Sequence, residues 1–309
     1  MRICRVQVGG IPVAAFYDES GVLPLPEIAK ASGLELEADD DILRYLPHGD
    51  LHSQAQQLAA WIKEHPAAAS ERASAPADAE LLVPIPCPPK LFLLAGNYAQ
   101  HIEEGGEKAA ERAETFPYVF MKPSSTTLTA PNQPVEIPAI SPDAIDWELE
   151  LAVVIGRGGK AIPAAKALEH VAGYTVVNDI SNRRFRPNPG RKERPRDKFF
   201  DWLHGKWHDS FCPCGPCITS SDAIPDPQSL AMELRVNGVV KQSANTGQQI
   251  FPVAEVIEFI SNLVTLEPGD MISTGTAAGV GNTTGDYLKA GDRIEAEIER
   301  IGVLQSPVV

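Results

Sequence analysis

The hydrophobic positions of the chain fall into short runs that predict β-strands. Runs rich in Leu, Val and Ile and bounded by Gly, Pro or Asp are typical of strands buried in a core. Such runs occur at 90–96, 116–121, 149–156, 172–179 and 270–274. Residues 292–301 alternate apolar and polar side chains and predict a final half-buried strand. Asn237-Gly238 separates two further runs and predicts the turn of a hairpin.

Two segments instead place their apolar residues at helical spacing. Residues 53–64 and 250–263 repeat apolar side chains every three or four positions, so each predicts an amphipathic helix. Residues 181–205 show no hydrophobic period. We expect them to form a loop that acts as a lid, because long structureless loops are uncommon inside compact domains and are often functional.

The elements divide into two predicted domains. Residues 1–65 combine two short alternating strands with the first helix and predict a small α+β unit. Residues 66–82 are rich in Ala, Ser and Pro, a composition typical of a linker. We therefore expect a larger domain at 83–309.

Composition limits the classes of partner. The 309 residues have a hydrophobic content of 43% and a net charge of −14. That content is ordinary for a globular protein, and the charge argues against a nucleic-acid or anionic-membrane partner. No apolar run is long enough to span a membrane, the first residues lack the apolar core of a signal peptide, and five cysteines do not form a disulfide framework in a chain of this length. We therefore expect a cytoplasmic protein.

Three acidic residues stand at the ends of predicted core strands. Glu148 and Glu150 are two positions apart, so both project from one face at the start of the 149–156 strand. Asp179 ends the next strand. Like charges in an apolar environment are unfavourable unless a proton or a cation lies between them, and a divalent ion with oxygen ligands fits. The sequence leaves a second interpretation open, in which the glutamates face solvent and the aspartate caps a turn.

Further polar positions are candidate site residues, each with a simpler alternative. His101 and Glu104 lie one helical turn apart, which is the arrangement of a general base held by a carboxylate or only of a solvated histidine on a charged helix. Lys206 is a candidate cation for an anionic centre. Residues 183–198 contain eight basic and two acidic residues, which predicts a flap over an anionic ligand or a solvated loop. The glycines of 275–281 expose N–H groups to an anion, and a carboxylate fits better than a nucleotide because the Lys-Ser/Thr of a phosphate loop is absent.

The cysteines at 212, 214 and 217 predict no chemistry. Cys214-Gly215-Pro216-Cys217 matches a redox tetrapeptide, but that motif needs its first Cys at a helix N-terminus. Here prolines surround the motif and a strand-like run follows it, so we predict structural cysteines.

Seven motifs, taken in order and spacing, together resemble the fumarylacetoacetate hydrolase family over most of residues 90–309. They are Gly96-Asn97-Tyr98, Met121-Lys122-Pro123-Ser124-Ser125, Asp146-Trp147-Glu148-Leu149-Glu150, Gly173-Tyr174-Thr175-Val176-Val177-Asn178-Asp179, Gly205-Lys206, Leu266-Glu267-Pro268-Gly269-Asp270 and Thr274-Gly275-Thr276. The resemblance implies an α+β fold, a mixed β-sheet roll or sandwich with helices packed outside. It also implies a homodimer. The small N-terminal domain fits a longer branch of the family, whereas the long basic flap and the three cysteines depart from the family pattern.

The resemblance also implies roles for the matching residues. The three carboxylates Glu148, Glu150 and Asp179 would ligate Mg²⁺ or Mn²⁺. The remaining positions belong to catalysis or to substrate binding. The implied catalytic residues are His101, Glu104 and Lys206. The expected substrate contacts are Lys122, Arg183, Arg184 and Thr276, and the two arginines belong to the flap, which predicts a second negative charge on the substrate.

The chemistry expected at this site starts from a 2-oxo acid. A divalent ion acts as a Lewis acid on the carboxylate and 2-oxo oxygens and stabilises an enolate. If C4 is also a carbonyl, water activated by His101 and Glu104 can attack it and break the C3–C4 bond. We therefore expect a C–C hydrolase acting on an acylpyruvate or another 2,4-dioxo acid. Decarboxylation of oxaloacetate, keto–enol isomerisation and dehydration of a 2-keto-3-deoxy sugar acid use the same enolate and stay open, as does a non-catalytic keto-acid-binding protein.

Overall fold

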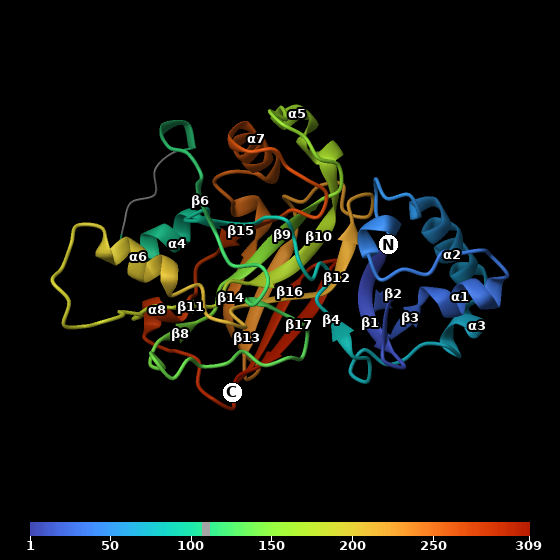
Figure 1. Cartoon of the computed structure of the whole chain (residues 1–309), viewed down its shortest axis with the longest axis horizontal. Helices are drawn as coiled ribbons and strands as arrows, with labels where there is room; N and C mark the ends of the chain where they lie inside the picture. The colour runs from blue at the N-terminus through green and yellow to red at the C-terminus, as the bar shows by residue number, and fades with distance from the viewer. Residues whose placement is uncertain (107–111) are drawn as a thin grey trace.

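A mixed β-sheet runs through the centre of the molecule and carries the candidate site (Figure 1). The computed structural model describes residues 1–106 and 112–309. The strands of the main sheet in these ranges are β1 (Arg2–Val8), β2 (Ile11–Asp18), β3 (Gly21–Pro24), β4 (Leu81–Leu82), β5 (Leu91–Ala95), β6 (Tyr118–Met121), β7 (Leu128–Thr129), β9 (Leu149–Ile155), β10 (Val171–Asn178), β12 (Cys212–Ser220) and β15 (Met271–Thr276). Their order is β3-β2-β1-β12-β10-β9-β15-β5-β6, with β4 beside β1 and β7 beside β12.

Two smaller sheets and several short helices surround the main sheet. One small sheet pairs β8 (Ile145–Asp146) with β11 (Ser181–Asn182). The other has the order β14-β13-β16-β17 and is built from β13 (Ala231–Val236), β14 (Val239–Asn245), β16 (Arg293–Ile298) and β17 (Gly302–Pro307). The α-helices of the described ranges are α1 (Leu25–Ser32), α2 (His52–Glu64), α3 (Pro66–Ser70), α4 (Ala99–Glu104), α5 (Ala164–Ala167), α6 (Asp197–His204), α7 (Val253–Leu263) and α8 (Gly281–Thr284).

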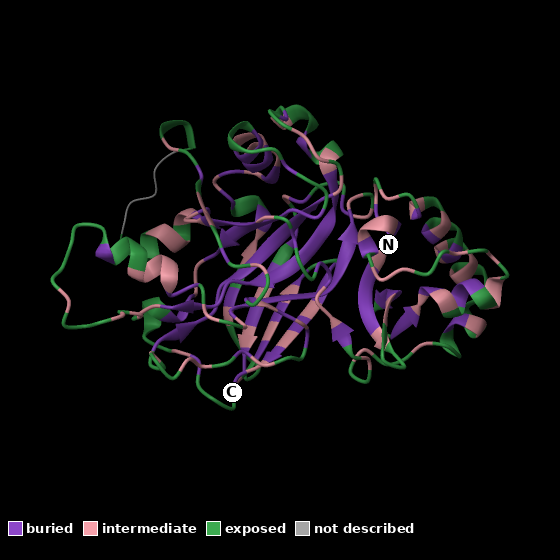
Figure 2. Ribbon diagram, in the orientation of Figure 1, coloured by how far each residue is buried: buried purple, intermediate pink, exposed green. Residues whose placement is uncertain are grey.

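The strands that carry the site are buried on both faces. Every residue of β9 and β10 is buried, whereas β13, β16 and β17 alternate between buried and partly exposed positions. β16 and β17 contact β10, so the four-stranded sheet covers one side of the main sheet with its apolar face. Strands covered on both sides are nearly continuous apolar runs, and strands with one solvated face alternate. Figure 2 shows this buried centre, with exposed residues in the loops and outer helices.

The predicted elements and the α+β class are confirmed. β5, β6, β9, β10, β15 and β16 lie at the predicted runs, α2 and α7 at the predicted helices, and Asn237-Gly238 turns between β13 and β14 with positive φ at both residues. The predicted linker 66–82 contains α3 and β4. The boundaries at 65 and 83 stay a prediction, since β1 pairs with β12 and the N-terminal strands continue the main sheet.

The lid segment differs from the prediction, because it contains helix α6. The side chain of Asp197 accepts the backbone N–H of Arg194 at 3.1 Å, and Arg191 pairs with Asp197 and Asp201 at 3.0 and 2.5 Å. These local contacts stabilise a helix too short for its hydrophobic period to be read from the sequence.

The three cysteines of β12 are buried and free, as predicted for structural residues. Burial raises the pKa of Cys212 and that of Cys217 to about 12, so neither thiol is ionised near neutral pH.

None of the helices in the described ranges has the length and apolar character needed to cross a membrane.

Candidate metal centre and catalytic pocket

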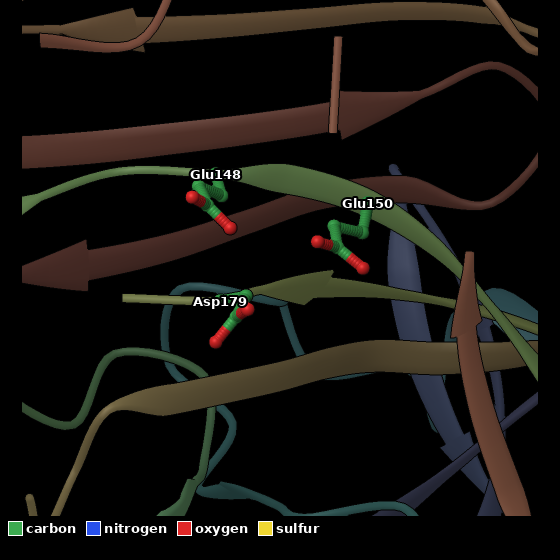
Figure 3. A group of neighbouring side chains, drawn as sticks. All are labelled: Glu148, Glu150 and Asp179. Atoms are coloured by element: carbon green, nitrogen blue, oxygen red, sulfur yellow. The ribbon is translucent and has the colours of Figure 1, made fainter. Parts of the chain in front are cut away.

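The three predicted carboxylates converge at one point on the main sheet. One oxygen from each of Glu148, Glu150 and Asp179 lies within 4.8 Å of the others, and all three residues are buried (Figure 3). The antiparallel register pairs Glu150 with Val177, and the N–H of Asp179 donates to the carbonyl of Glu148 at 2.8 Å. Because both strands end here, the side chains from their two ends point into one space.

The oxygens of Glu150 show that this space suits a divalent cation. Oε2 accepts from Ser273 Oγ at 2.6 Å and from Gly275 N at 2.8 Å, while Oε1 is buried with no partner among the described residues. Burial, together with repulsion from Asp179 and Glu148, raises the pKa of Glu150 well above its ordinary value. This oxygen and the two neighbouring carboxylates together form a set of hard oxygen donors, which Mg²⁺ and Mn²⁺ prefer as ligands. The three residues fit such an ion.

Two buried lysines form ion pairs with the carboxylates. Lys206 Nζ lies 2.9 Å from Glu148 Oε2 and 2.5 Å from Asp179 Oδ2, and it also donates to Ser181 Oγ at 2.9 Å. Burial alone would lower the pKa of Lys206, but Asp179 and Glu148 raise it, so the ammonium stays charged. Lys122 Nζ donates to Asp179 Oδ1 and to the carbonyl of Phe211, both at 2.6 Å, and is enclosed by protein. Lys122, which was predicted to contact the substrate, is therefore buried in the protein with its ammonium bound to Asp179.

Arg183 connects the carboxylates to the flap. Its Nε donates to Asp146 Oδ2 at 2.7 Å, and its Nη2 lies 2.6 Å from Glu148 Oε1. Burial would raise the pKa of Glu148, but the charges of Lys206 and Arg183 hold it below its ordinary value. Glu148 is therefore an anion.

Most other flap cations are occupied by partners within the protein. Arg186 pairs with Glu193 at 2.8 Å, and Arg191 and Arg194 pair with acidic residues of α6. The guanidinium of Arg184 lies 5.3 Å from the ring centre of Tyr287. The structure therefore brings Arg183 to the site and places Arg184 on an aromatic ring.

A cavity of about 60 Å³ opens beside the carboxylates. It is lined by Leu94, Ala95, Gly96, His101, Glu148, Arg183, Trp202, Lys206 and Thr276. The first turn of α4 brings His101 into this wall. Nδ1 of His101 is buried without a partner among the residues that the structure describes. Burial lowers the pKa of His101 below its ordinary value, with Arg183 and Lys206 acting in the same direction and Glu148 and Glu104 opposing it. The imidazole is therefore neutral near pH 7.

Glu104 does not hold His101. Its Oε2 accepts the backbone N–H of Gly279 at 2.9 Å, and no hydrogen bond joins the predicted pair within the described residues. The sequence correctly placed both on one helix, but it could not show which partner Glu104 takes.

The backbone N–H groups of the glycine-rich segment bind anionic groups, as predicted, but these groups are carboxylates of the protein itself. Gly275, Gly279 and Gly281 donate to Glu150, Glu104 and Asp146 respectively. Gly275 has φ +87°, and a Cβ there would come within 2.9 Å of Asn97.

Thr276 lines the cavity, and its hydroxyl is already occupied. The hydroxyl donates to the carbonyl of Leu149 at 2.9 Å and accepts from Gln242 Nε2 at 2.8 Å. These two hydrogen bonds fix the position of the Thr276 side chain in the wall of the cavity.

Several site residues were not predicted. Ser273 and Ser181 hold the carboxylates and Lys206, and Trp202 covers the cavity from α6. Of these residues, Asp146 could have been found from the sequence. It stands directly before Trp147 at the start of a core strand, where an acid is buried, and buried charged residues nearly always have partners.

Comparison with known proteins agrees with this geometry. The family model of the fumarylacetoacetate (FAA) hydrolase C-terminal domain matches residues 90–309. The chain is 40% identical over 230 residues to oxaloacetate tautomerase FAHD2A, mitochondrial, from Bos taurus, covering 74% of this chain and 69% of that protein. It superposes on the 5-carboxymethyl-2-hydroxymuconate delta-isomerase from Mycobacterium smegmatis with a TM-score of 0.69 and 30% identity, over 100% of this chain and 98% of that one.

A third relative was solved with ligands. Maleylpyruvate hydrolase from Sphingobium sp. SYK-6, in complex with manganese (II) ion and pyruvate, has a TM-score of 0.70 and 27% identity, over 100% of this chain and 99% of that one. Fold, site and sequence agree, and the chain belongs to the fumarylacetoacetate hydrolase family.

Proposed function

We propose that the protein is a divalent-metal-dependent enzyme that interconverts the keto and enol forms of a small dicarboxylic 2-oxo acid, with oxaloacetate as the first substrate to test. The observation that carries this proposal is the neutral, partly buried imidazole of His101, which lines a small cavity beside the three carboxylates and makes no hydrogen bond with Glu104. A neutral base without an orienting acid suits proton transfer, which needs no attacking water. The likeness to an oxaloacetate tautomerase and to an isomerase supports this class of reaction.

The residues divide the work as follows. Glu148, Glu150 and Asp179 hold Mg²⁺ or Mn²⁺, which supplies Lewis acidity toward the carboxylate and 2-oxo oxygens of the substrate when bound. The imidazole of His101 accepts the proton from C3 of the keto form and delivers it to the 2-oxo oxygen, which gives the enol, and it carries the proton the opposite way in the reverse reaction. Lys206 offsets the charge that develops on the substrate in this step.

Two further residues bind and enclose the substrate. The guanidinium of Arg183 lines the cavity and binds the second carboxylate of the substrate. Trp202 covers the cavity and excludes water.

The test follows the decay of the enol absorbance of oxaloacetate with purified protein and Mg²⁺ or Mn²⁺. The proposal expects accelerated decay that disappears in the Glu148→Gln and His101→Asn variants, with each reaction mixture analysed by NMR for pyruvate. If the wild type with metal does not exceed the metal-only rate, the proposal is wrong. Asp270→Asn is a matched control, because Asp270 is a buried carboxylate held by Lys90 outside the cavity.

Hydrolysis of an acylpyruvate is the second candidate. It is supported by the likeness to a hydrolase solved with Mn²⁺ and pyruvate. Incubation with an acylpyruvate would then yield pyruvate and a free acid. Glu104→Gln would abolish this hydrolysis, because activation of the attacking water would require His101 and Glu104 together. Pyruvate formed from oxaloacetate instead would indicate decarboxylation.

A further inference from the structure

A fourth buried carboxylate lies next to the triad, and its contacts are not those of a metal ligand. Asp146 is fully buried. Its Oδ1 accepts from the N–H of Trp147 at 2.8 Å and of Gly281 at 2.6 Å, and its Oδ2 accepts from the N–H of Asn282 at 3.0 Å and from Arg183 Nε at 2.7 Å. All four partners are donors, so this environment suits a carboxylate, and the described residues provide no acceptor for a carboxyl proton.

The contact with Arg183 fixes the direction of the guanidinium. Nε faces Asp146 while Nη2 faces Glu148 Oε1, so the planar fork is held between two acids. A guanidinium held at one edge by a fixed partner loses little further freedom when it binds a ligand. Without Asp146, Nε would be buried with no acceptor, and Glu148 alone would direct the side chain.

Asp146 also connects Arg183 to the glycine-rich segment 275–281. Gly281 and Asn282 begin α8, directly after the glycine-rich segment. That segment binds Glu104 through Gly279, and Glu104 lies on the helix that carries His101. A Cβ at Gly281 would come within 2.8 Å of Asp146 Oδ1, so the close approach requires glycine.

We propose that Asp146 is a positioning residue that holds Arg183 in register with Glu148 and with the glycine-rich segment, so that the second acid group of the substrate meets a preformed guanidinium. The nature of the substrate rests on the proposed function, whereas the hold on Arg183 does not. Asparagine cannot replace Asp146, because its NH₂ group would face the N–H of Asn282 or of Arg183.

A kinetic double-mutant cycle tests the proposal with Asp146→Asn, Arg183→Gln and the double variant. Displacing a binding group by about 1 Å can cost about 100-fold, so we expect Arg183→Gln to lower kcat/KM by about 100-fold and Asp146→Asn by at least about tenfold, mainly through KM. If Asp146 acts through Arg183, the double variant lies within about threefold of Arg183→Gln. Multiplicative losses, or an Asp146→Asn variant within about threefold of wild type, would overturn the proposal. Asp270→Asn controls for the loss of a buried carboxylate.

A second measurement does not depend on turnover. The Nε–H resonance of Arg183 is assigned in ¹H–¹⁵N spectra by its loss in Arg183→Gln. We expect it to shift or to exchange away in Asp146→Asn and to stay in place in Asp270→Asn, and an unchanged resonance contradicts the proposal even if the kinetics agree. If Asp146→Asn does not fold, Asp146→Ser enters the same cycle and spectra. A wild type inactive on every 2-oxo acid tested refutes the proposed function alone, since the spectra still report on Asp146.

Discussion

Replacing Glu150 by Gln separates the repulsion within the carboxylate triad from the metal binding that offsets it. The oxygens of the triad lie within 4.8 Å of one another, and two charges at that limit repel by about 3.5 kcal/mol at an effective dielectric constant of about 20. Glu150 faces two such charges, on Asp179 and Glu148. Lys206 and a proton bound to the triad cancel most of the repulsion between these carboxylates. We therefore expect Glu150→Gln to raise the free energy of unfolding of the metal-free protein by about 2 kcal/mol at pH 7.5. The amide keeps one oxygen for Ser273 and Gly275.

The sign with respect to pH follows from the raised pKa of Glu150. The folded state retains a proton at pH values where the unfolded carboxyl, with a pKa of about 4.3, has lost it. The wild-type free energy of unfolding therefore falls as pH rises from about 4.3 through the raised pKa, and the variant lacks this contribution.

Calorimetry with and without Mn²⁺ measures both effects. Mn²⁺ at about 100 times its Kd stabilises the wild type by about 2.7 kcal/mol, or about 5 °C in Tm. The variant should gain less than about 1 kcal/mol, because an amide replaces a charged ligand. An equal Tm increase in Glu150→Gln would refute its role as ligand, and a metal-free variant less stable than wild type would refute the repulsion argument. Asp270→Asn should keep the full Mn²⁺ effect.

Four further predictions concern the residues around the triad. Because burial lowers the pKa of His101, the acid limb of the wild-type kcat/KM profile should have its midpoint below pH ~6.5, and a midpoint above that value would contradict the role of His101 as the base. Glu104→Gln should cost less than about tenfold in tautomerase kcat, since an amide oxygen can still accept from Gly279, whereas a base-holding role predicts a loss of about 100-fold or more. Lys206→Met should lower the free energy of unfolding of the metal-free protein by about 3 kcal/mol in urea titrations, because two buried carboxylates lose the ammonium that they share and keep only Lys122 and Arg183 as cations. Arg184→Ala should leave KM for oxaloacetate within about twofold, whereas Arg183→Ala should raise it about 100-fold, because of these two arginines only Arg183 lines the cavity.

Local periodicity predicted the strands and placed the three acidic residues at strand ends, whereas their role as one ligand set was implied by the family resemblance. Period-two alternation places Glu148 and Glu150 on one face, and Asp179 follows a strand that pairs beside them. The partners of the remaining polar groups depend on distant segments. Asp146 meets Arg183 at a separation of 37 residues and Gly281 at 135.

Hydrophobic pattern contains no information on such pairings. The basic segment was therefore predicted as a flap over an anionic ligand, although Arg191 and Arg194 pair with acids of α6 and Arg183 is the one residue of the segment that lines the cavity. The bond between Glu104 and Gly279, 175 residues apart, was missed for the same reason.

The pairing of β1 with β12 has a consequence for truncated forms of the chain. Arg2 and Ile3 pair with Thr219 and Ile218, which belong to a strand interior to the main sheet. Removing the first strand would turn this part of β12 into an open edge rich in apolar residues, and such edges recruit strands from other molecules. The N-terminal unit thus also protects solubility, and a fragment containing only the family-matched region would tend to self-associate even with every catalytic residue present.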